Sequence, residues 1–301
     1  MKKTVIKVNK DTNRVGITGL ERLVEINRSQ GVVVLMPKID VYLELEPGVE
    51  VDGHPFQDRV NDAIDKALAS DLSSIEEFCT RIIAFLLQGY TDARGAEVAA
   101  DAGYVVMRKT PKTKLKTQEM YKILGRALSE DGKVRKMVGV EVTGISTCPC
   151  AHEGLLEESK IKLGENFTDA EINKILDALP IASHNQRNVA QILLEVSDGH
   201  EDEVEAEDLI SIIEASMSSR LYEVLKREDE VAVVLDAHSN PNFVEDIVRK
   251  ILISIVNRYP DLSDDALVFT RSESFESIHQ HNAIAERLAK LGELRKEGNS
   301  G

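Results

Sequence analysis

The first regular pattern along the chain is an alternation of apolar and polar residues over positions 38–45, preceded by the apolar run VVVLM at 32–36. A period of two residues is typical of a strand that buries one face, and it favours an antiparallel sheet covered on one side. The stretch from Gly31 to Glu46 is therefore predicted to be strand. The residues expected on its buried face are Ile39, Val41, Leu43 and Leu45.

Apolar residues spaced three and four positions apart follow this strand and predict two helices, one around residues 60–68 and a stronger one around 75–86. A further strand is expected over 96–109. After a basic loop, the apolar residues within 120–128 predict a short helix. Alternating valines over 138–142 then predict a strand that leads into the sequence TCPC.

The second half of the chain repeats this order of elements. The expected elements are strands over 187–196 and 266–271 and helices around 209–213, 244–255 and 284–294. Asn240 or Asn242 is expected to cap the second of these helices. Strands thus flank a pair of helices twice, which predicts an α+β protein of two related modules, residues 1–131 and 132–301. A charged segment near 153–182 is expected to be a helical insertion in the second module.

Composition narrows the class of protein further. The 301 residues carry 37 Lys and Arg against 52 Asp and Glu, a net charge of −15, which argues against a nucleic-acid-binding protein and against docking on an anionic membrane. No run approaches the roughly 18 apolar residues of a membrane span, and the polar N-terminal stretch predicts no signal peptide. Three cysteines, an odd number, favour a reducing compartment. We therefore expect a soluble, cytoplasmic protein.

Cys148, Pro149 and Cys150 follow a predicted strand, at an element end of the kind where functional residues gather. Their spacing matches neither a CxxC motif nor half of a zinc ribbon. It leaves two interpretations open: a thiolate exposed in a turn, or two small apolar residues that close a strand. Cys79, by contrast, lies on the apolar face of a predicted helix and is expected in the core.

Several polar residues also admit two interpretations. The segment SHNQR (183–187) is either a solvated turn or a histidine ligand whose neighbours orient a substrate. Glu276 and His279 would provide a general base and a metal ligand, or merely a capping interaction. Glu245 lies in the first turn of a predicted helix, where the macrodipole alone favours a carboxylate. A basic cluster is either a solvated loop or a site for substrate phosphates. Its members are Arg108, Lys109, Lys112, Lys114 and Lys116.

Five segments of the C-terminal half identify a family when they are taken together and in order. They are KMVGVEVTGISTCPCA (136–151), IASHNQR (181–187), LYEVLKREDE (221–230), NPNFVED (240–246) and ESIHQHNAIAER (276–287). With RVGITGLERL (14–23), they resemble the type IB GTP cyclohydrolases, most closely the archaeal branch that opens methanopterin synthesis. The long connection between CPC and SHNQR also resembles the archaeal branch.

The resemblance implies a fold and a reaction. The fold is the tunnelling fold (T-fold), with antiparallel sheets and paired helices in two tandem modules, assembled into homodimers or homotetramers with sites at subunit interfaces. The reaction is hydrolysis of the guanine imidazole ring of GTP, which releases C8 as formate. The archaeal product is 7,8-dihydroneopterin 2′,3′-cyclic phosphate. The alternative product, 7,8-dihydroneopterin triphosphate, is that of bacterial relatives.

The resemblance also implies a metal centre. Cys148 corresponds to the catalytic metal thiolate, with His184, Glu230 and His279 as further ligands. One thiolate, two imidazoles and one carboxylate suit Fe(II), which the archaeal branch uses, and also Zn(II) or Mn(II). Such a set leaves room for water, and a metal is needed because water at neutral pH is a poor nucleophile toward C8.

Roles in catalysis and substrate binding are implied for five further positions, one of them shared with the metal centre. Glu276 and His279 are expected to move protons during ring opening. Glu245 corresponds to the carboxylate that accepts hydrogen bonds from N1–H and the 2-amino group of guanine. Gln186 and Arg187 are expected to contact the substrate, with Arg187 near the α-phosphate.

Two competing functions remain at this level. Another T-fold enzyme, the nitrile reductase of queuosine synthesis, would use a nucleophilic cysteine and NADPH, but it leaves His184 and Glu230 without a role. A non-enzymatic alternative is an oligomeric protein that binds pterins or purines without metal. Four separated ligand-type residues favour the cyclohydrolase.

Overall fold

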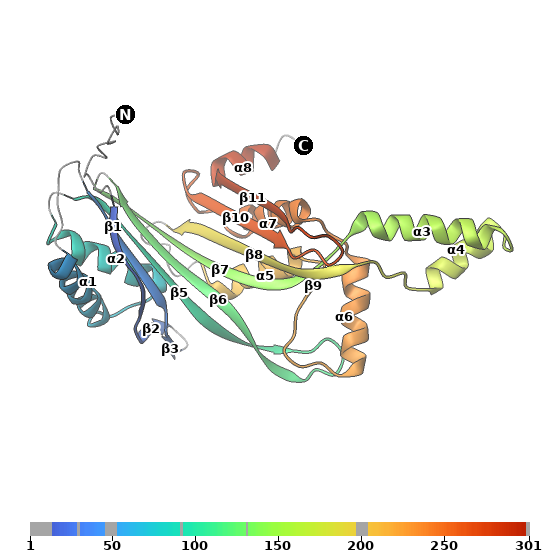
Figure 1. The fold of residues 1–301 in the computed structure, drawn as a ribbon, viewed down its shortest axis with the longest axis horizontal. Helices are drawn as coiled ribbons and strands as arrows, with labels where there is room; N and C mark the ends of the chain where they lie inside the picture. The colour runs from blue at the N-terminus through green and yellow to red at the C-terminus, as the bar shows by residue number, and fades with distance from the viewer. Residues whose placement is uncertain are drawn as a thin grey trace, which may run out of the picture. The chain divides into compact units, whose positions relative to one another are not determined.

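The computed structural model describes residues 14–28, 31–45, 53–90, 93–130, 132–196 and 204–298 (Figure 1). The chain forms two compact units. One contains the described residues up to 103 with 124–138 and 196, and the other contains 104–123, 139–195 and 204–298. Four strands contribute residues to both units: β5 (Ala93–Lys109), β6 (Lys116–Glu130), β7 (Lys133–Thr147) and, through its last residue alone, β8 (Asn185–Val196). The division into modules at residues 131 and 132 stays a prediction.

In the first unit, antiparallel strands accompany a pair of helices. Its further elements are β1 (Arg14–Glu21), β2 (Val24–Arg28), β3 (Gly31–Leu35), β4 (Lys38–Leu45), α1 (Gly53–Leu68) and α2 (Ile75–Leu87). β4 pairs with β1 and β5, and its alternate apolar residues are buried as the sequence predicts. α2 lies close to β6, where a Cβ at Gly125 would come within 2.9 Å of the Ile75 carbonyl oxygen. Glycine therefore permits this approach of helix to strand.

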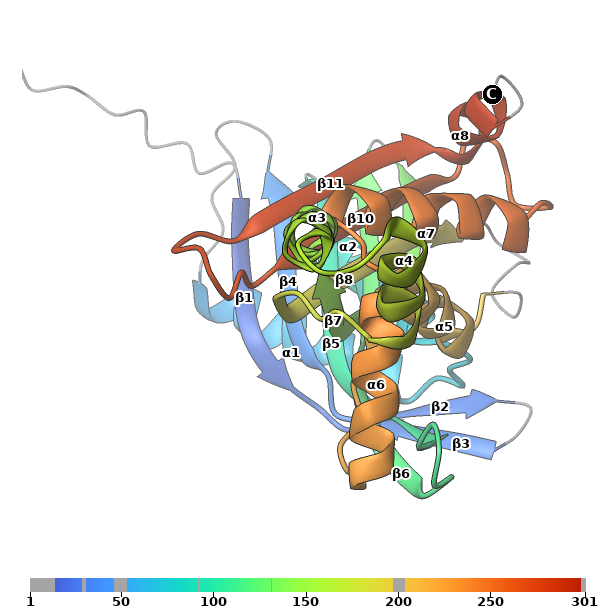
Figure 2. The same ribbon diagram turned by 90° about the vertical axis from the view of Figure 1, so that its right-hand side faces the viewer.

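The second unit adds three strands of the main sheet, a short strand and six helices among the described residues. These elements are α3 (Pro149–Gly164), α4 (Asp169–Ala178), β8 (Asn185–Val196), α5 (Ala206–Ser216), β9 (Ser219–Arg220), α6 (Arg227–Ser239), α7 (Val244–Arg258), β10 (Leu267–Ser274), β11 (Ala283–Lys290) and α8 (Leu291–Gly298). Figure 2 shows α7 alongside β10 and β11, and α7 packs against both strands and against α5. Hydrogen bonds join the strands in the order β1-β4-β5-β6-β7-β8-β10-β11, with β9 beside β7 and β2–β3 as a separate hairpin.

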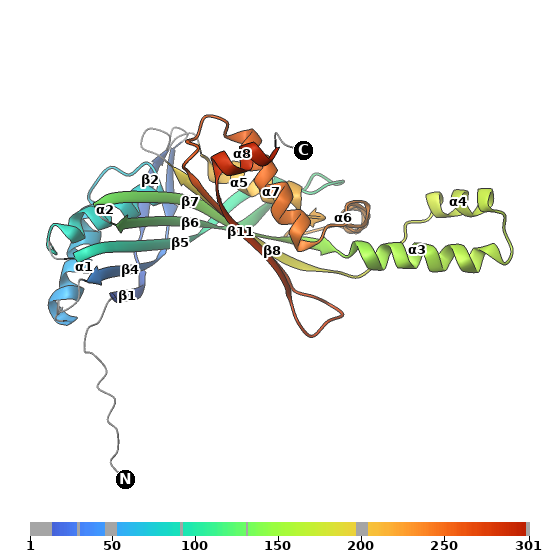
Figure 3. The ribbon, with the colours of Figure 1, turned by 90° about the horizontal axis from the view of Figure 1, so that it is seen from above.

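The charged segment expected to form an insertion contains α3 and α4. These two helices form a hairpin that connects the end of β7 to the start of β8 (Figure 3). α3 has no buried residue and α4 buries Ile172. A helix that buries nothing gains little stability from packing, so its own propensity and its charged side chains sustain it. Among the described residues, no helix is long and apolar enough to cross a membrane.

The prediction of a helix around 120–128 is wrong, because these residues belong to strand β6. The buried face of this strand contains polar side chains at Thr117 and Glu119. Glu119 accepts hydrogen bonds from the Thr117 hydroxyl at 2.5 Å and from the Glu223 N–H at 2.9 Å. Polar residues on a buried face hide the alternation, and the exposed Met120 then completes a false helical pattern.

The predicted helix around 284–294 is also wrong over most of its length. Residues 283–290 form β11, which pairs with β10, and the helix α8 begins only at Leu291. Ile284 and Leu288 are exposed on this edge strand, so their spacing of four reflects no helical face. The cap of α7 differs as well: Phe243, not Asn240 or Asn242, is the N-cap residue, and its N–H donates to Asp246.

Helices α2 and α7 match residue by residue, which extends the repeat beyond element order. Each begins with an apolar residue followed by two acidic residues, Ile75-Glu76-Glu77 and Val244-Glu245-Asp246. The buried residues then fall at the same positions: Phe78, Cys79, Ile82, Ile83 and Leu86 in α2, and Ile247, Val248, Ile251, Leu252 and Ile255 in α7. Glu76 is buried, whereas its counterpart Glu245 is exposed. Cys79 lies in the core as predicted.

Candidate metal and substrate site

Four parts of the second unit meet around a cavity of about 240 Å³. They are the end of β7, the start of β8, the first turn of α7, and the end of β10 with the loop that joins it to β11. Strand ends and loops carry the polar groups, while the sheet holds their positions. The lining residues that carry candidate chemistry are Cys148, His184, Gln186, Glu245, Glu276, His279 and His281.

Cys148 is half-buried at the junction of β7 and α3, where it is the N-cap residue of α3. Its N–H donates to the His184 carbonyl at 3.3 Å, and its own carbonyl accepts from the Ser183 hydroxyl at 3.2 Å. These bonds join the end of β7 to the segment before β8. Cys150, in the first turn of α3, is exposed and does not line the cavity.

Gln186 orients two of the candidate residues. Its amide nitrogen lies 3.1 Å from the Glu276 carboxylate and 3.1 Å from the Ser274 hydroxyl, and its amide oxygen lies 3.0 Å from His184 Nδ1. A carboxylate only accepts, so the amide NH₂ must face Glu276 and the amide oxygen must face His184. Nδ1 of His184 therefore carries the proton that Gln186 accepts. In the neutral ring of this tautomer, Nε2 has a free lone pair, the form in which histidine binds a metal.

The loop between β10 and β11 carries two imidazoles into the cavity. The ring centroids of His184 and His279 are 6.5 Å apart in an edge arrangement, and those of His279 and His281 are 5.1 Å apart and stacked. Residues 275–282 form an irregular loop, so no helical face brings Glu276 and His279 together. Instead, the bond from Gln186 holds Glu276, and the stack on His281 supports His279.

Glu245 lines the same cavity from the second position of α7. Its side chain is exposed, so the carboxylate is free to meet a ligand entering the cavity. The unpaired N–H groups of the first helical turn favour negative charge there. The helix-end interpretation and the substrate-binding interpretation of Glu245 are therefore compatible.

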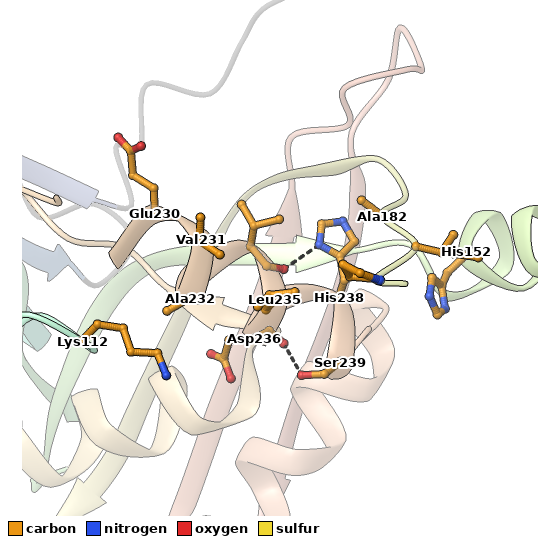
Figure 4. A pocket seen from close by; sticks show the side chains of 13 residues that line it. Lys112, His152, Ala182, Glu230, Val231, Ala232, Leu235, Asp236, His238 and Ser239 are labelled. Atoms are coloured by element: carbon orange, nitrogen blue, oxygen red, sulfur yellow. Dashed lines mark hydrogen bonds between the residues drawn. The ribbon is translucent and has the colours of Figure 1, made fainter. Parts of the chain in front are cut away.

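Glu230 and Arg187 lie outside this cavity. Glu230, exposed in the first turn of α6, lines a larger cavity of about 820 Å³ with Lys112 and His238 (Figure 4). Arg187 is exposed on β8, and its carbonyl accepts the Phe275 N–H at 2.9 Å. The role of Glu230 as a metal ligand and that of Arg187 as a substrate contact stay predictions.

The residue before Glu230 has a clear structural role. Burial disfavours the charge of Asp229, yet the Thr113 hydroxyl and N–H and the Lys112 N–H donate to its carboxylate and together lower its pKa. The Lys226 N–H, at 3.2 Å, adds a capping bond. Asp229 thus fastens the start of α6 to the turn between β5 and β6. That turn carries Lys112 and Lys114 of the basic cluster. The interpretation of this cluster as a phosphate site stays a prediction.

The donor types in the smaller cavity fit a transition metal. A thiol and two imidazoles, from Cys148, His184 and His279, suit Fe(II), Zn(II) or Mn(II), and the predicted carboxylate ligand, Glu230, lies outside this cavity. Among the described residues, no three His, Cys, Asp or Glu side chains are already grouped closely enough to hold an ion. The cavity therefore gathers suitable donors, and their side chains must still close around an ion.

Three residues of the site have no role predicted from the sequence. Ser183 and His281 lie inside the segments SHNQR and ESIHQH, whose polar side chains are the signal that marks them. Ser274, which is buried and contacts Gln186, is an ordinary serine at a strand end and carries no sequence signal.

Comparison with known proteins identifies the sequence family. Residues 1–285 match the family described as type I GTP cyclohydrolase folE2. The chain is 41% identical over 292 residues to "GTP cyclohydrolase MptA" of Methanothermobacter thermautotrophicus, which covers 94% of this chain and 91% of that protein. It is 39% identical over 292 residues to the protein of the same name from Methanobrevibacter smithii, over 94% and 93% of the two chains.

Comparison with solved structures identifies the fold. The uricase of Arthrobacter globiformis matches with a TM-score of 0.55 over 95% of this chain and 96% of that chain, at 9% sequence identity. At such low identity the likeness concerns the fold alone. The fold is the α+β tunnelling fold, as the sequence resemblance implied.

Proposed function

This chain belongs to the type I GTP cyclohydrolase family, and from that premise we propose how its cavity performs the reaction. The protein is an enzyme that acts on GTP, opening the guanine imidazole ring and releasing C8 as formate. The observation that carries the proposal is the grouping of Cys148, His184, His279 and Glu276 in one cavity with Glu245. These residues include ligand types, proton carriers and a carboxylate suited to guanine.

Cys148, His184 and His279 would hold the metal, which we propose to be Fe(II), with Zn(II) or Mn(II) as alternatives. When bound, the ion supplies Lewis acidity that makes water nucleophilic at neutral pH. Gln186 supports the site by accepting the Nδ1 proton of His184, which leaves Nε2 free. Glu230 is a further proposed ligand.

The remaining side chains bind the substrate and move protons. Glu245 accepts N1–H and one 2-amino proton of guanine, a bidentate match that a carboxylate provides. Glu276 and His279 carry protons to and from the guanine nitrogens as the bonds to C8 break. The Gln186 amide holds the Glu276 carboxylate at 3.1 Å, so this proton carrier has a fixed position in the cavity.

For the product, we propose 7,8-dihydroneopterin 2′,3′-cyclic phosphate, made in the first step of methanopterin synthesis. The relatives named MptA and the α3–α4 insertion support this product over the triphosphate. The cyclic phosphate forms when a ribose hydroxyl attacks the α-phosphate and expels pyrophosphate. A cation such as Arg187 would stabilise the charge that develops in that step.

We also propose a homodimer or homotetramer with its sites at subunit interfaces. Two features of α6 support this assembly. The helix exposes Val231, Val234 and Leu235, which line the larger cavity, and such apolar patches favour protein contacts. Glu230 lines a different cavity from Cys148 within one chain, so Glu230 of the partner subunit is the proposed source of that ligand.

The test is anaerobic incubation of metal-free protein with GTP and Fe(II), Zn(II) or Mn(II) in separate reactions. Formate, pyrophosphate and the mass of the pterin are measured in each. Formate with pyrophosphate and a cyclic monophosphate supports the full proposal. Formate with an intact triphosphate chain would replace the proposed product by the alternative. No formate with any metal would reject the proposed reaction in favour of a pterin- or purine-binding protein.

A further inference from the structure

His238, in the last turn of α6, uses both ring nitrogens although the proposed reaction gives it no task. Its Nδ1 lies 2.7 Å from the Val234 carbonyl oxygen in the same helix (Figure 4). Its Nε2 lies 3.0 Å from the Ser183 carbonyl oxygen. A carbonyl oxygen only accepts, and a neutral imidazole carries a single N–H, so the Nε2–H tautomer is the form that donates to the Ser183 carbonyl, and only a doubly protonated ring would donate to both carbonyls. The side chain is 8% exposed, so water does not readily replace them.

Ser183 connects His238 with the proposed metal ligands. Its hydroxyl lies 3.2 Å from the Cys148 carbonyl and 3.4 Å from the His184 carbonyl. The Cys148 N–H in turn donates to the His184 carbonyl at 3.3 Å. The carbonyl that His238 holds therefore belongs to the peptide bond immediately before His184, in the segment tied to Cys148.

Helix α6 is a suitable support for such a contact. The Asp229 carboxylate fastens its first turn through hydrogen bonds from Lys112 and Thr113. Val233 and Ala237 are its buried apolar residues. With the first turn fixed by Asp229 and the last turn by His238, the helix is held at both ends.

We propose that His238 is a positioning residue for the metal site. Its hydrogen bond to the Ser183 carbonyl holds the segment before β8 against α6, and so keeps His184 and Cys148 in the cavity. This inference rests on the proposed function, because it concerns the geometry of the same ligands. Residues that orient ligands without touching the metal typically change metal affinity by about 10–100-fold when replaced.

Two amide substitutions separate the two hydrogen bonds. In His238→Gln, the amide nitrogen can occupy the position of Nε2 and donate to Ser183. In His238→Asn, the side chain is one carbon shorter and reaches only the position of Nδ1, so it keeps the bond to Val234 and loses the bond to Ser183. Ser239→Ala is a matched control, since this exposed side chain of the same turn bonds the Asp236 carbonyl.

The experiment is an anaerobic titration of metal-free protein with Co(II), followed by the thiolate-to-cobalt absorption band. The wild type, His238→Gln and Ser239→Ala should bind within about threefold of one another, and His238→Asn about 10–100-fold more weakly. With saturating Fe(II), His238→Asn should lower kcat while the KM for GTP stays within about twofold, since Glu245 is untouched.

The two proposals fail in different ways. Equal cobalt affinity in His238→Asn and the wild type would overturn the role of His238, and so would a loss in His238→Gln as large as that in His238→Asn. Absence of the thiolate band in the wild type itself would instead refute the proposed metal site. Circular dichroism of each variant checks that the fold is retained, and the Gln–Asn comparison holds the polarity of the side chain constant.

Discussion

Replacement of Gln186 by methionine tests the orientation of His184 most sharply. Methionine has a similar length but cannot form any of the three hydrogen bonds of the Gln186 amide, to His184, Glu276 and Ser274. Without the amide oxygen, His184 Nδ1 keeps the longer contact to the exposed Ser277 hydroxyl at 3.5 Å. The proton on Nδ1 is then held less firmly and can occupy Nε2. A protonated Nε2 cannot bind a metal.

The size of the effect follows from what each partner retains. Ser274 keeps the Ser146 hydroxyl at 3.0 Å, and His184 and Glu276 are half-buried, so water can replace part of what they lose. At about 0.5–1.5 kcal/mol per net hydrogen bond, the free energy of unfolding of the metal-free protein should fall by about 1–3 kcal/mol. Metal affinity should fall by about 10–100-fold, or roughly 1.4–2.7 kcal/mol.

Denaturant unfolding gives the first quantity, and anaerobic titration with Fe(II) against a competing chelator gives the second. Gln191→Met is the matched control. Gln191 lies on the same strand, is also half-buried, and donates to the Glu141 carboxylate away from the cavity. It should lose stability but keep its metal. Wild-type metal affinity in Gln186→Met, or an equal loss in Gln191→Met, would refute the reasoning.

Three further substitutions test separate parts of the account. Glu245→Gln should retain metal but weaken GTP binding by about 2–4 kcal/mol in calorimetry, because an amide cannot accept two donors; unchanged affinity would remove Glu245 from the guanine site. Burial raises the pKa of Glu76 above its usual 4.5, so its contribution to stability is lost as the pH rises through the raised value. The free energy of unfolding of the wild type should therefore fall relative to that of Glu76→Gln from pH 4.5 upward. A difference between the two that does not change with pH would contradict this. For Asp229, hydrogen bonds outweigh burial and lower the pKa, so its contribution is lost as the pH falls below the usual 3.8. Below pH 3.8, the free energy of unfolding of the wild type should approach that of Asp229→Asn. A difference that stays constant with pH would be evidence against the lowered pKa.

Periodicity predicted the elements that bury one regular face. Strand β4 and helices α2 and α7 carry such faces, and they lie where the sequence placed them. It failed at β6, where buried Glu119 satisfies its carboxylate through Thr117 and Glu223. The partner on residue 223 is 104 positions away, so no local pattern can reveal it.

The same limit applies to the site. Motifs identified the residues that line the cavity, including Cys148, His184 and Glu276, because the chemistry of these side chains is visible in the sequence. The contacts that orient them were hidden. Ser274 and His238 act through tertiary hydrogen bonds to Gln186 and Ser183, and only the folded chain brings these pairs together.

The most direct test of the central claim is a joint measurement of metal content and formate release in two cysteine variants. Cys148→Ala and Cys150→Ala are loaded anaerobically with Fe(II), freed of excess metal and incubated with GTP. The account predicts that Cys148→Ala folds but loses both bound iron and formate, whereas Cys150→Ala, whose side chain lies outside the cavity, retains both. Full iron content and turnover in Cys148→Ala would contradict a metal centre built on this thiolate.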